Sequence, residues 1–139
     1  MTNSISSEDT AATSLPKLLI VENHGPTQTF VRYVLQDAYA LTVVDTPQAA
    51  TKASEETPFD AVLVDIALQA PHDGVELMNT LRDADAYRDT PIAAMTAYAM
   101  PGDKKKFLEM GFDAYISKPF VRAEMMDLVK TLLPQKRLS

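Results

Sequence analysis

The sequence predicts an α/β fold in which helices cover both faces of a doubly wound, five-stranded parallel sheet. Five short apolar runs alternate with helical patterns along the 139 residues, and this alternation is typical of right-handed strand–helix–strand units. The run Ala61-Val62-Leu63-Val64 is apolar throughout, as expected for a strand that is covered on both faces. The chain length favours one domain over two.

Each expected strand is a short apolar run with polar or turn-forming residues beside it. The strands are expected at residues 17–21, 40–44, 61–65, 92–95 and 114–117. The helices are expected at about 27–37, 47–56, 75–82, 101–110 and 125–133. The last helix shows the i, i+3, i+4, i+7 apolar spacing of an amphipathic helix most clearly.

Local signals support several of these helices. Asp45 or Thr46 can cap the second helix, Pro47 is tolerated in its first turn, and Gly111 is a suitable end for the fourth. The apolar side chains expected to face the core from the first three helices are Phe30, Val31, Val34 and Leu35, then Ala49, Ala50 and Ala53, then Val75, Met78 and Leu81.

Composition limits the classes of function. The apolar content of 46%, the charged content of 23% and the net charge of −6 are typical of a globular protein and argue against a direct nucleic-acid or membrane binder. The absence of cysteine excludes disulfides and thiolate metal sites. Residues 1–14 resemble a disordered tail, 15–134 the folded domain and 135–139 a short second tail. With no signal peptide or membrane span, a cytoplasmic location is expected.

The central strand ends on a carboxylate, Asp65. A buried charge is costly, so Asp65 is expected where the strand opens to water. In open parallel sheets, ligands bind at the carboxyl edge. Asp65 is therefore the candidate reactive group, although a strand-terminal aspartate is often only a turn or cap residue.

Other polar side chains follow the neighbouring strands and are expected at the same edge. The first strand is followed by Glu22 and Asn23, the fourth by Thr96 and the fifth by Lys118. Carboxylate and amide oxygens suit Mg²⁺, and a carboxylate can form an aspartyl-phosphate. A lysine and a threonine hydroxyl can bind the phosphoryl oxygens. Each residue alone has a plainer structural explanation, so the prediction depends on their occurrence together.

Four motifs resemble a known family in order and spacing. They are Leu-Leu-Ile-Val-Glu-Asn, Val-Leu-Val-Asp-Ile, Met-Thr-Ala-Tyr-Ala and Ala-Tyr-Ile-Ser-Lys-Pro-Phe. Over about residues 16–133 the chain resembles the receiver domain of bacterial two-component response regulators. The resemblance implies the flavodoxin-like fold of chemotaxis-type regulators, with strand order 2-1-3-4-5.

The resemblance also assigns roles to the residues at the strand ends. It implies that Asp65 accepts phosphate from a histidine kinase or phosphotransfer protein, and that the chain catalyses only its own phosphorylation and dephosphorylation. The Mg²⁺ ligands would be Glu22, Asn23, Asp65 and the Ala67 backbone carbonyl. Lys118 would contact the phosphoryl group before a cis peptide bond to Pro119, and Thr96 and Tyr115 would form the switch.

The resemblance further implies how the signal would leave the domain. Phosphorylation would remodel the face formed by the helix near 101–110, the strand at 114–117 and the last helix. This face would include Lys104, Lys105, Lys106, Tyr115 and Arg122. The signal would then pass to a downstream protein, through a homodimer, or with the phosphate to another histidine. The lysine run has two interpretations, a solvated helix face or a docking site for an acidic partner.

One position departs from the family pattern. Asn23 stands where the family usually has aspartate, which predicts weaker Mg²⁺ binding because carboxylate count tunes affinity for hard cations. The alternative is a degenerate receiver that acts as an interaction module without phosphate. The stretch from Asp65 to Gly74 is also one residue longer than in short receivers, as in receivers attached to hybrid kinases.

Three enzyme or cofactor classes fit the sequence less well. A flavin mononucleotide binder needs a neutral phosphate cradle after the first strand, where Glu22 stands. A dinucleotide enzyme needs a Gly-x-Gly-x-x-Gly motif, which is absent. A dehalogenase-type phosphatase needs a second aspartate two residues after the nucleophile, where Ala67 stands.

Overall fold

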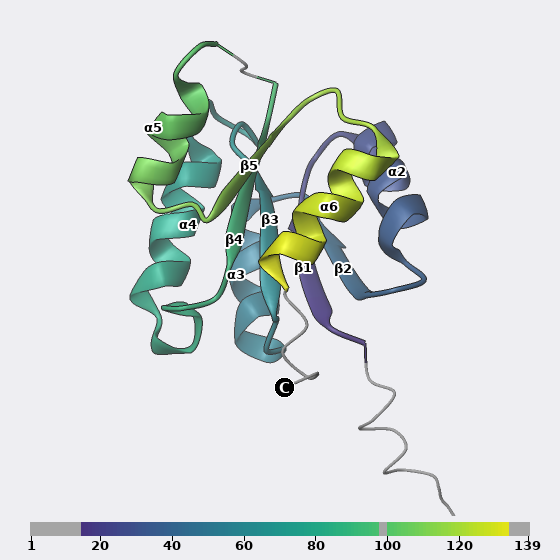
Figure 1. Cartoon of the computed structure of the whole chain (residues 1–139). Helices are drawn as coiled ribbons and strands as arrows, with labels where there is room; N and C mark the ends of the chain where they lie inside the picture. The colour runs from purple at the N-terminus through teal and green to yellow at the C-terminus, as the bar shows by residue number, and fades with distance from the viewer. Residues whose placement is uncertain (1–14, 98–99, 134–139) are drawn as a thin grey trace, which may run out of the picture.

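The computed structural model describes residues 15–97 and 100–133. The two predicted tails, the end of the last helix at Pro134, and Tyr98 and Ala99 of the third motif lie outside these ranges. Figure 1 shows three layers, with a central sheet between helices α2 and α6 on one face and helices α3, α4 and α5 on the other. No helix within the described ranges is long and apolar enough to cross a membrane.

The sheet confirms the predicted fold and strand order. Its strands are β1 (Lys17–Val21), β2 (Ala40–Val44), β3 (Ala61–Asp65), β4 (Ile92–Thr96) and β5 (Ala114–Ser117). They are parallel and lie in the order β2-β1-β3-β4-β5. Strand β4 extends one residue further than predicted, because Thr96 still pairs with Ser117. This register brings the carboxyl ends of β1, β3, β4 and β5 to one edge, called here the carboxyl edge.

The helices occur where predicted, but several bounds differ. They are α2 (Gly25–Leu35), α3 (Pro47–Glu56), α4 (Asp73–Asp83), α5 (Asp103–Met110) and α6 (Arg122–Leu132). Helix α2 begins two residues earlier than expected, because Pro26 fits the first turn, where its missing N–H is not needed. Helix α5 begins two residues later than expected, because Pro101 and Gly102 form a turn in which Gly102 has a φ of 90°.

Two cap predictions are confirmed. The Thr46 hydroxyl accepts a hydrogen bond from the Ala49 N–H at 3.0 Å and caps α3. Gly111 ends α5 with a φ of 125°, a conformation that favours glycine. Both positions fix where a helix starts or stops relative to the sheet.

The sheet separates two apolar clusters. One packs under α3, α4 and α5, and the other under α2 and α6. Three expected core residues on this side of the sheet are only half-buried, Ala49 and Ala53 in α3 and Val75 in α4. In α4, Leu77 is buried instead. Phe30 is also half-buried and packs against the second cluster.

A short 3₁₀ helix, η1 (Asp85–Tyr87), was not predicted. It holds the buried side chain of Tyr87, whose hydroxyl lies 2.9 Å from the Ser54 carbonyl oxygen and 2.8 Å from that of Thr57. The same hydroxyl accepts a hydrogen bond from the Phe59 N–H. This residue ties the end of α3 and the start of β3 to the turn before β4.

Arg82 stabilises the edge opposite the carboxyl edge, called here the amino edge. Its guanidinium donates to the carbonyls of Tyr87, Arg88, Thr90 and Gly111. It also pairs with Asp113 at 2.7 Å, and Asp113 accepts the Ile92 N–H. Strand β1 begins and helix α6 ends at this amino edge, because α6 runs antiparallel to the strands (Figure 1).

Candidate functional site

Two carboxylates lie at the carboxyl edge, almost without contact with solvent. Asp65 ends β3 and is 5% exposed, and Glu22 directly follows β1 and is 0% exposed. The pairing of Val21 with Val64 places the two residues that follow on neighbouring strands. Because a buried charge is costly unless it is paired, a cation must compensate this pair.

Lys118 supplies that positive charge. Its ammonium Nζ lies 2.7 Å from Glu22 Oε1 and 3.0 Å from Asp65 Oδ2. The backbone places it, because the Lys118 N–H donates to the Thr96 carbonyl at 2.7 Å. The peptide bond to Pro119 is cis, as the sequence predicted. Residues from three separate strand ends therefore meet at one ammonium group.

The pKa values follow from this arrangement. For Lys118, burial lowers the pKa, but the hydrogen bonds and charges of Glu22 and Asp65 outweigh it, so the pKa lies above the usual value. For Glu22, burial is the largest cause and raises the pKa. The bond from Lys118 and the His24 N–H oppose this, and the charge of Asp65 adds to it. The ionised form of Glu22 is therefore held at a cost to stability.

Replacing Glu22 with glutamine is expected to stabilise the metal-free protein near neutral pH. A raised pKa means that the folded state favours the neutral carboxyl of Glu22. The stability that this protonated form contributes is lost as the pH rises through the folded-state pKa. A neutral isostere removes that loss. The melting temperature should rise by a few degrees, about the effect of 1 kcal/mol in a domain of this size. Thermal unfolding in EDTA at pH 7 measures it, and a lower melting temperature would contradict the argument.

Thr96 and Tyr115 lie on the strands beside this pair. Thr96, the last residue of β4, is 1% exposed. Tyr115 on β5 is half-buried and stacks on Phe107 of α5, with ring centroids 5.7 Å apart and planes 19° from parallel. Burial, and then the charge of Asp103, raise the pKa of the Tyr115 phenol. Tyr115 therefore connects β5 to α5.

Asn23 and His24 lie at the exposed rim of the site. The Asn23 side-chain amide donates to the Leu68 carbonyl at 2.8 Å. His24 is exposed, and its Nδ1 lies 2.8 Å from the Thr27 hydroxyl. Of the predicted site residues, Glu22 and Asp65 both contact Lys118, whereas Asn23 bonds to the loop after β3.

That loop, residues 66–72, is called here the β3–α4 loop. Its Ala67 N–H donates to Asp65 Oδ1 at 3.1 Å, so the backbone of Ala67 lies against the carboxylate. The Asp73 carboxylate accepts the N–H groups of Gln69 and Ala70 at 2.9 and 2.8 Å. Asp73 was not predicted as a positioning residue, but an aspartate at the start of a helix is a recognisable signal.

Gly74 packs directly against the end of β3. Its N–H donates to the Ile66 carbonyl at 2.8 Å, and a Cβ added there would lie 2.3 Å from the Asp65 carbonyl oxygen. The sequence indicated only a turn at this glycine. The structure shows that glycine is required because two backbone segments approach closely.

The donor atoms at the carboxyl edge suit a hard divalent cation. Glu22 Oε1 is fully buried and lies 2.7 Å from the Lys118 ammonium, and a carboxylate oxygen in this position keeps a lone pair for a second partner. Within the described residues, no three His, Cys, Asp or Glu side chains converge. A cation would therefore need the Ala67 carbonyl and the Asn23 amide oxygen beside the two carboxylates, which is a chemically suitable oxygen set.

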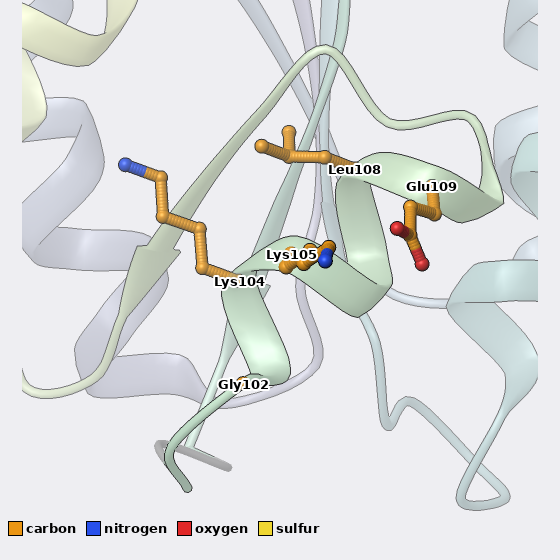
Figure 2. A pocket seen from close by; sticks show the side chains of 5 residues that line it. All are labelled: Gly102, Lys104, Lys105, Leu108 and Glu109. Carbon is orange, nitrogen blue, oxygen red and sulfur yellow. The ribbon is translucent and has the colours of Figure 1, made fainter.

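The described residues also form surface cavities, one beside this site and another on α5. One, of about 420 Å³, lies beside Lys118 and is lined in part by His24, Phe30 and Phe120. The other, of about 520 Å³, lies over the exposed side of α5. Figure 2 shows Lys104 and Glu109 of this second cavity extending toward opposite sides of the view, with Leu108 between them. The second cavity therefore has a lining of basic, acidic and apolar residues.

Comparison with known proteins gives a consistent result. The family model described as response regulator receiver domain matches residues 18–130. The chain is 34% identical over 130 residues to the transcriptional regulatory protein PrrA of Mycobacterium tuberculosis, covering 92% of this chain and 54% of PrrA. It is 29% identical over 126 residues to the sensor histidine kinase GacS of Pseudomonas protegens, covering 88% of this chain and 14% of GacS. The chain thus spans at most about half of these two relatives.

Solved structures agree with this match. The receiver domain of the sensor histidine kinase PA1611 from Pseudomonas aeruginosa, described with a magnesium ion coordinated in its active site cleft, is 31% identical with a TM-score of 0.76. The match covers 86% of this chain and 98% of that one. The chemotaxis response regulator CheY4 of Vibrio cholerae has a TM-score of 0.79 at 22% identity, covers 86% and 100% of the two chains, and shows the fold alone.

Proposed function

Because this chain belongs to the response regulator receiver domain family, we propose that it is a phosphorylatable receiver of a two-component phosphorelay. The phosphoacceptor would be Asp65, and the donor a phosphohistidine on a histidine kinase or phosphotransfer protein. The observation that carries the proposal is the Lys118 ammonium, held within 3.0 Å of Asp65 and 2.7 Å of Glu22 at the carboxyl edge.

The proposed step is a nucleophilic displacement at phosphorus. An oxygen of the Asp65 carboxylate attacks the phosphorus atom, and the bond between phosphorus and the donor imidazole nitrogen breaks. The electron pair of that bond stays on the nitrogen, and the product is an acyl phosphate on Asp65. Hydrolysis by water would later return the free carboxylate and inorganic phosphate.

Lys118 and Thr96 would stabilise the transferred group. The Lys118 ammonium already faces Asp65 Oδ2, so it can turn toward phosphoryl oxygens without a change of the backbone. The buried Thr96 hydroxyl belongs to the neighbouring strand end and would donate a hydrogen bond to one of these oxygens. Because the site excludes most water, such interactions are stronger than at an exposed surface.

A magnesium ion would be held by Glu22, Asp65, the Asn23 amide oxygen and the Ala67 carbonyl. When bound, it would neutralise the charge that develops on the phosphoryl oxygens. The donor set of this chain and the magnesium described for the Pseudomonas aeruginosa receiver domain support this proposal. Glu22 also anchors Lys118, so it would balance two cations rather than one.

Asn23→Asp is expected to tighten Mg²⁺ binding by about tenfold, because a third carboxylate increases the attraction for a hard cation. Isothermal titration calorimetry of Mg²⁺ on the wild type and the variant measures this change. Asn79→Asp is the matched control, since Asn79 is exposed on α4 and the added charge is the same. Equal affinity in the wild type and Asn23→Asp would show that residue 23 does not face the cation.

The output surface would be the face formed by α5, β5 and α6. Thr96 would move toward the phosphoryl group, and Tyr115 would turn inward behind it. The stacking of Tyr115 on Phe107 would carry the change to α5. This is a local charge change that biases a two-state element. The signal would reach a downstream protein, a second copy of the chain or another histidine.

The basic residues of this face are exposed. Lys104, Lys105 and Lys106 all face solvent on α5. On α6, Arg122 lies over the Tyr33 ring of α2, 6.0 Å from its centroid. Both interpretations of the lysine run, a solvated face and a docking site for an acidic partner, are compatible with this exposure.

Intact-mass spectrometry after incubation with acetyl phosphate and Mg²⁺ tests the proposed function. We expect one phosphoryl adduct on the wild type, none with EDTA and none on Asp65→Asn. The control Asp83→Asn replaces an exposed aspartate at the end of α4 and should keep the adduct. No adduct at saturating Mg²⁺ would favour the phosphate-independent interaction module instead.

A further inference from the structure

We propose that Asn23 is a positioning residue that clamps the β3–α4 loop to the end of β1 before any cation binds. Its side-chain Nδ2 donates to the Leu68 carbonyl oxygen at 2.8 Å, a bond between residues 45 apart in the sequence. This inference deepens the proposed function, because the loop carries the Ala67 carbonyl of the proposed metal site.

The chemistry of the contact requires an amide at position 23. A backbone carbonyl oxygen only accepts hydrogen bonds, so the group facing Leu68 must be the NH₂ end of the Asn23 side chain. An ionised aspartate at this position has no hydrogen to donate, and its oxygen would face another partial negative charge. The departure from the family pattern therefore supplies a bond that the usual residue cannot make.

Apart from the Ile66 N–H, which donates to the Met95 carbonyl of β4, the other hydrogen bonds of this loop come from its own chain segment. The Ala67 N–H donates back to Asp65, two residues earlier, and the Asp73 carboxylate accepts from Gln69 and Ala70, four and three residues before it. The Asn23 bond falls between these two anchors and comes from another strand. The Leu68 side chain is buried in the core cluster under α4, so its backbone is already close to its bound position.

The consequence concerns what a cation must do on binding. In a receiver without the clamp, binding would also have to order the loop that offers its carbonyl, and this ordering costs conformational entropy. Here the Asn23 amide has already placed that segment. The clamp thereby compensates in part for the carboxylate that Asn23 replaces, and it would let the site keep its shape between successive binding events.

Amide hydrogen exchange, followed by NMR in EDTA without a phosphodonor, tests the clamp. The reporters are the N–H groups of Ala67, Gln69 and Ala70, which all donate hydrogen bonds within or beside the loop. In Asn23→Ala and Asn23→Asp these amides should exchange about fivefold faster, the factor that one ordinary hydrogen bond contributes. The control Asn79→Asp and the Leu63 amide inside β3 should not change.

A second readout separates positioning from general support of the fold. Saturating Mg²⁺ should restore the slow exchange of the loop amides in Asn23→Asp. A cation bound to the new carboxylate and to the Ala67 carbonyl would then hold the loop in place of the lost hydrogen bond.

Three results would overturn the clamp. They are unchanged loop exchange in both variants, faster exchange in Asn23→Ala alone, and faster exchange spread over the β3 amides as well. The exchange rates are measured without phosphate or metal, so they decide the clamp even if Asp65 takes up no phosphoryl group. A failure of the proposed function would appear instead in the mass spectra of the wild type.

Discussion

Replacing Lys118 with alanine is expected to slow phosphorylation of Asp65 by about a hundredfold and to destabilise the metal-free protein by about 3 kcal/mol. The rate falls because the ammonium 3.0 Å from Asp65 is the positive side chain that can meet the phosphoryl oxygens. The stability falls because Glu22, which is 0% exposed, and Asp65 would both keep buried charges without their shared partner.

Two measurements check the effects of Lys118→Ala. Urea unfolding in EDTA gives the change in stability, and a time course of acetyl phosphate uptake at saturating Mg²⁺ gives the change in rate. Lys104→Ala is the control, because it removes an exposed lysine of α5 and leaves the carboxyl edge intact. Unchanged stability would mean that another group compensates the negative charges of the two carboxylates. An unchanged rate would remove Lys118 from the proposed mechanism.

Gly74→Ala is expected to have a comparably large effect, through packing rather than charge. The added methyl group would lie 2.3 Å from the Asp65 carbonyl oxygen and 2.7 Å from the Ile66 Cα. Both are backbone atoms, so no side-chain rotation can relieve the clash. We expect a loss of about 3 kcal/mol of stability, together with slower phosphorylation, because the end of β3 that carries the phosphoacceptor must move.

The glycine at the start of α2 provides the matched comparison. A Cβ added to Gly25 meets nothing within 4 Å, so Gly25→Ala should leave the urea midpoint almost unchanged. Both variants are compared by urea unfolding and then by acetyl phosphate uptake under conditions where each is fully folded. If Gly74→Ala behaves like Gly25→Ala, the close approach of α4 to β3 does not constrain the site.

The sequence was sufficient where local pattern decides the structure. The run from Ala61 to Asp65 predicted β3 correctly, because a strand buried on both faces needs apolar residues throughout. The site could be anticipated for the same reason, since parallel strands bring Glu22, Asp65 and Lys118 to one edge. The contacts between these three side chains were then a consequence of strand order.

The sequence was insufficient where contacts between distant segments decide. Nothing near Asp85–Tyr87 predicts a 3₁₀ helix, because Tyr87 is held by carbonyl groups about 30 residues earlier. Arg82 looks like a surface residue in its helix, yet it links two later turns, the one before β4 and the one after α5. The Asn23 bond to Leu68 depends on the direction of one amide, which composition and spacing do not encode.

The positions of the start of β1 and the end of α6 have a practical consequence for building sensors from this domain. Strand β1 begins and helix α6 ends at the amino edge, whereas Asp65 lies at the carboxyl edge (Figure 1). Fluorescent proteins joined before β1 and after α6 would therefore lie at the amino edge and leave Asp65 open to a phosphodonor. Energy transfer between them would report on the domain without blocking entry to the pocket.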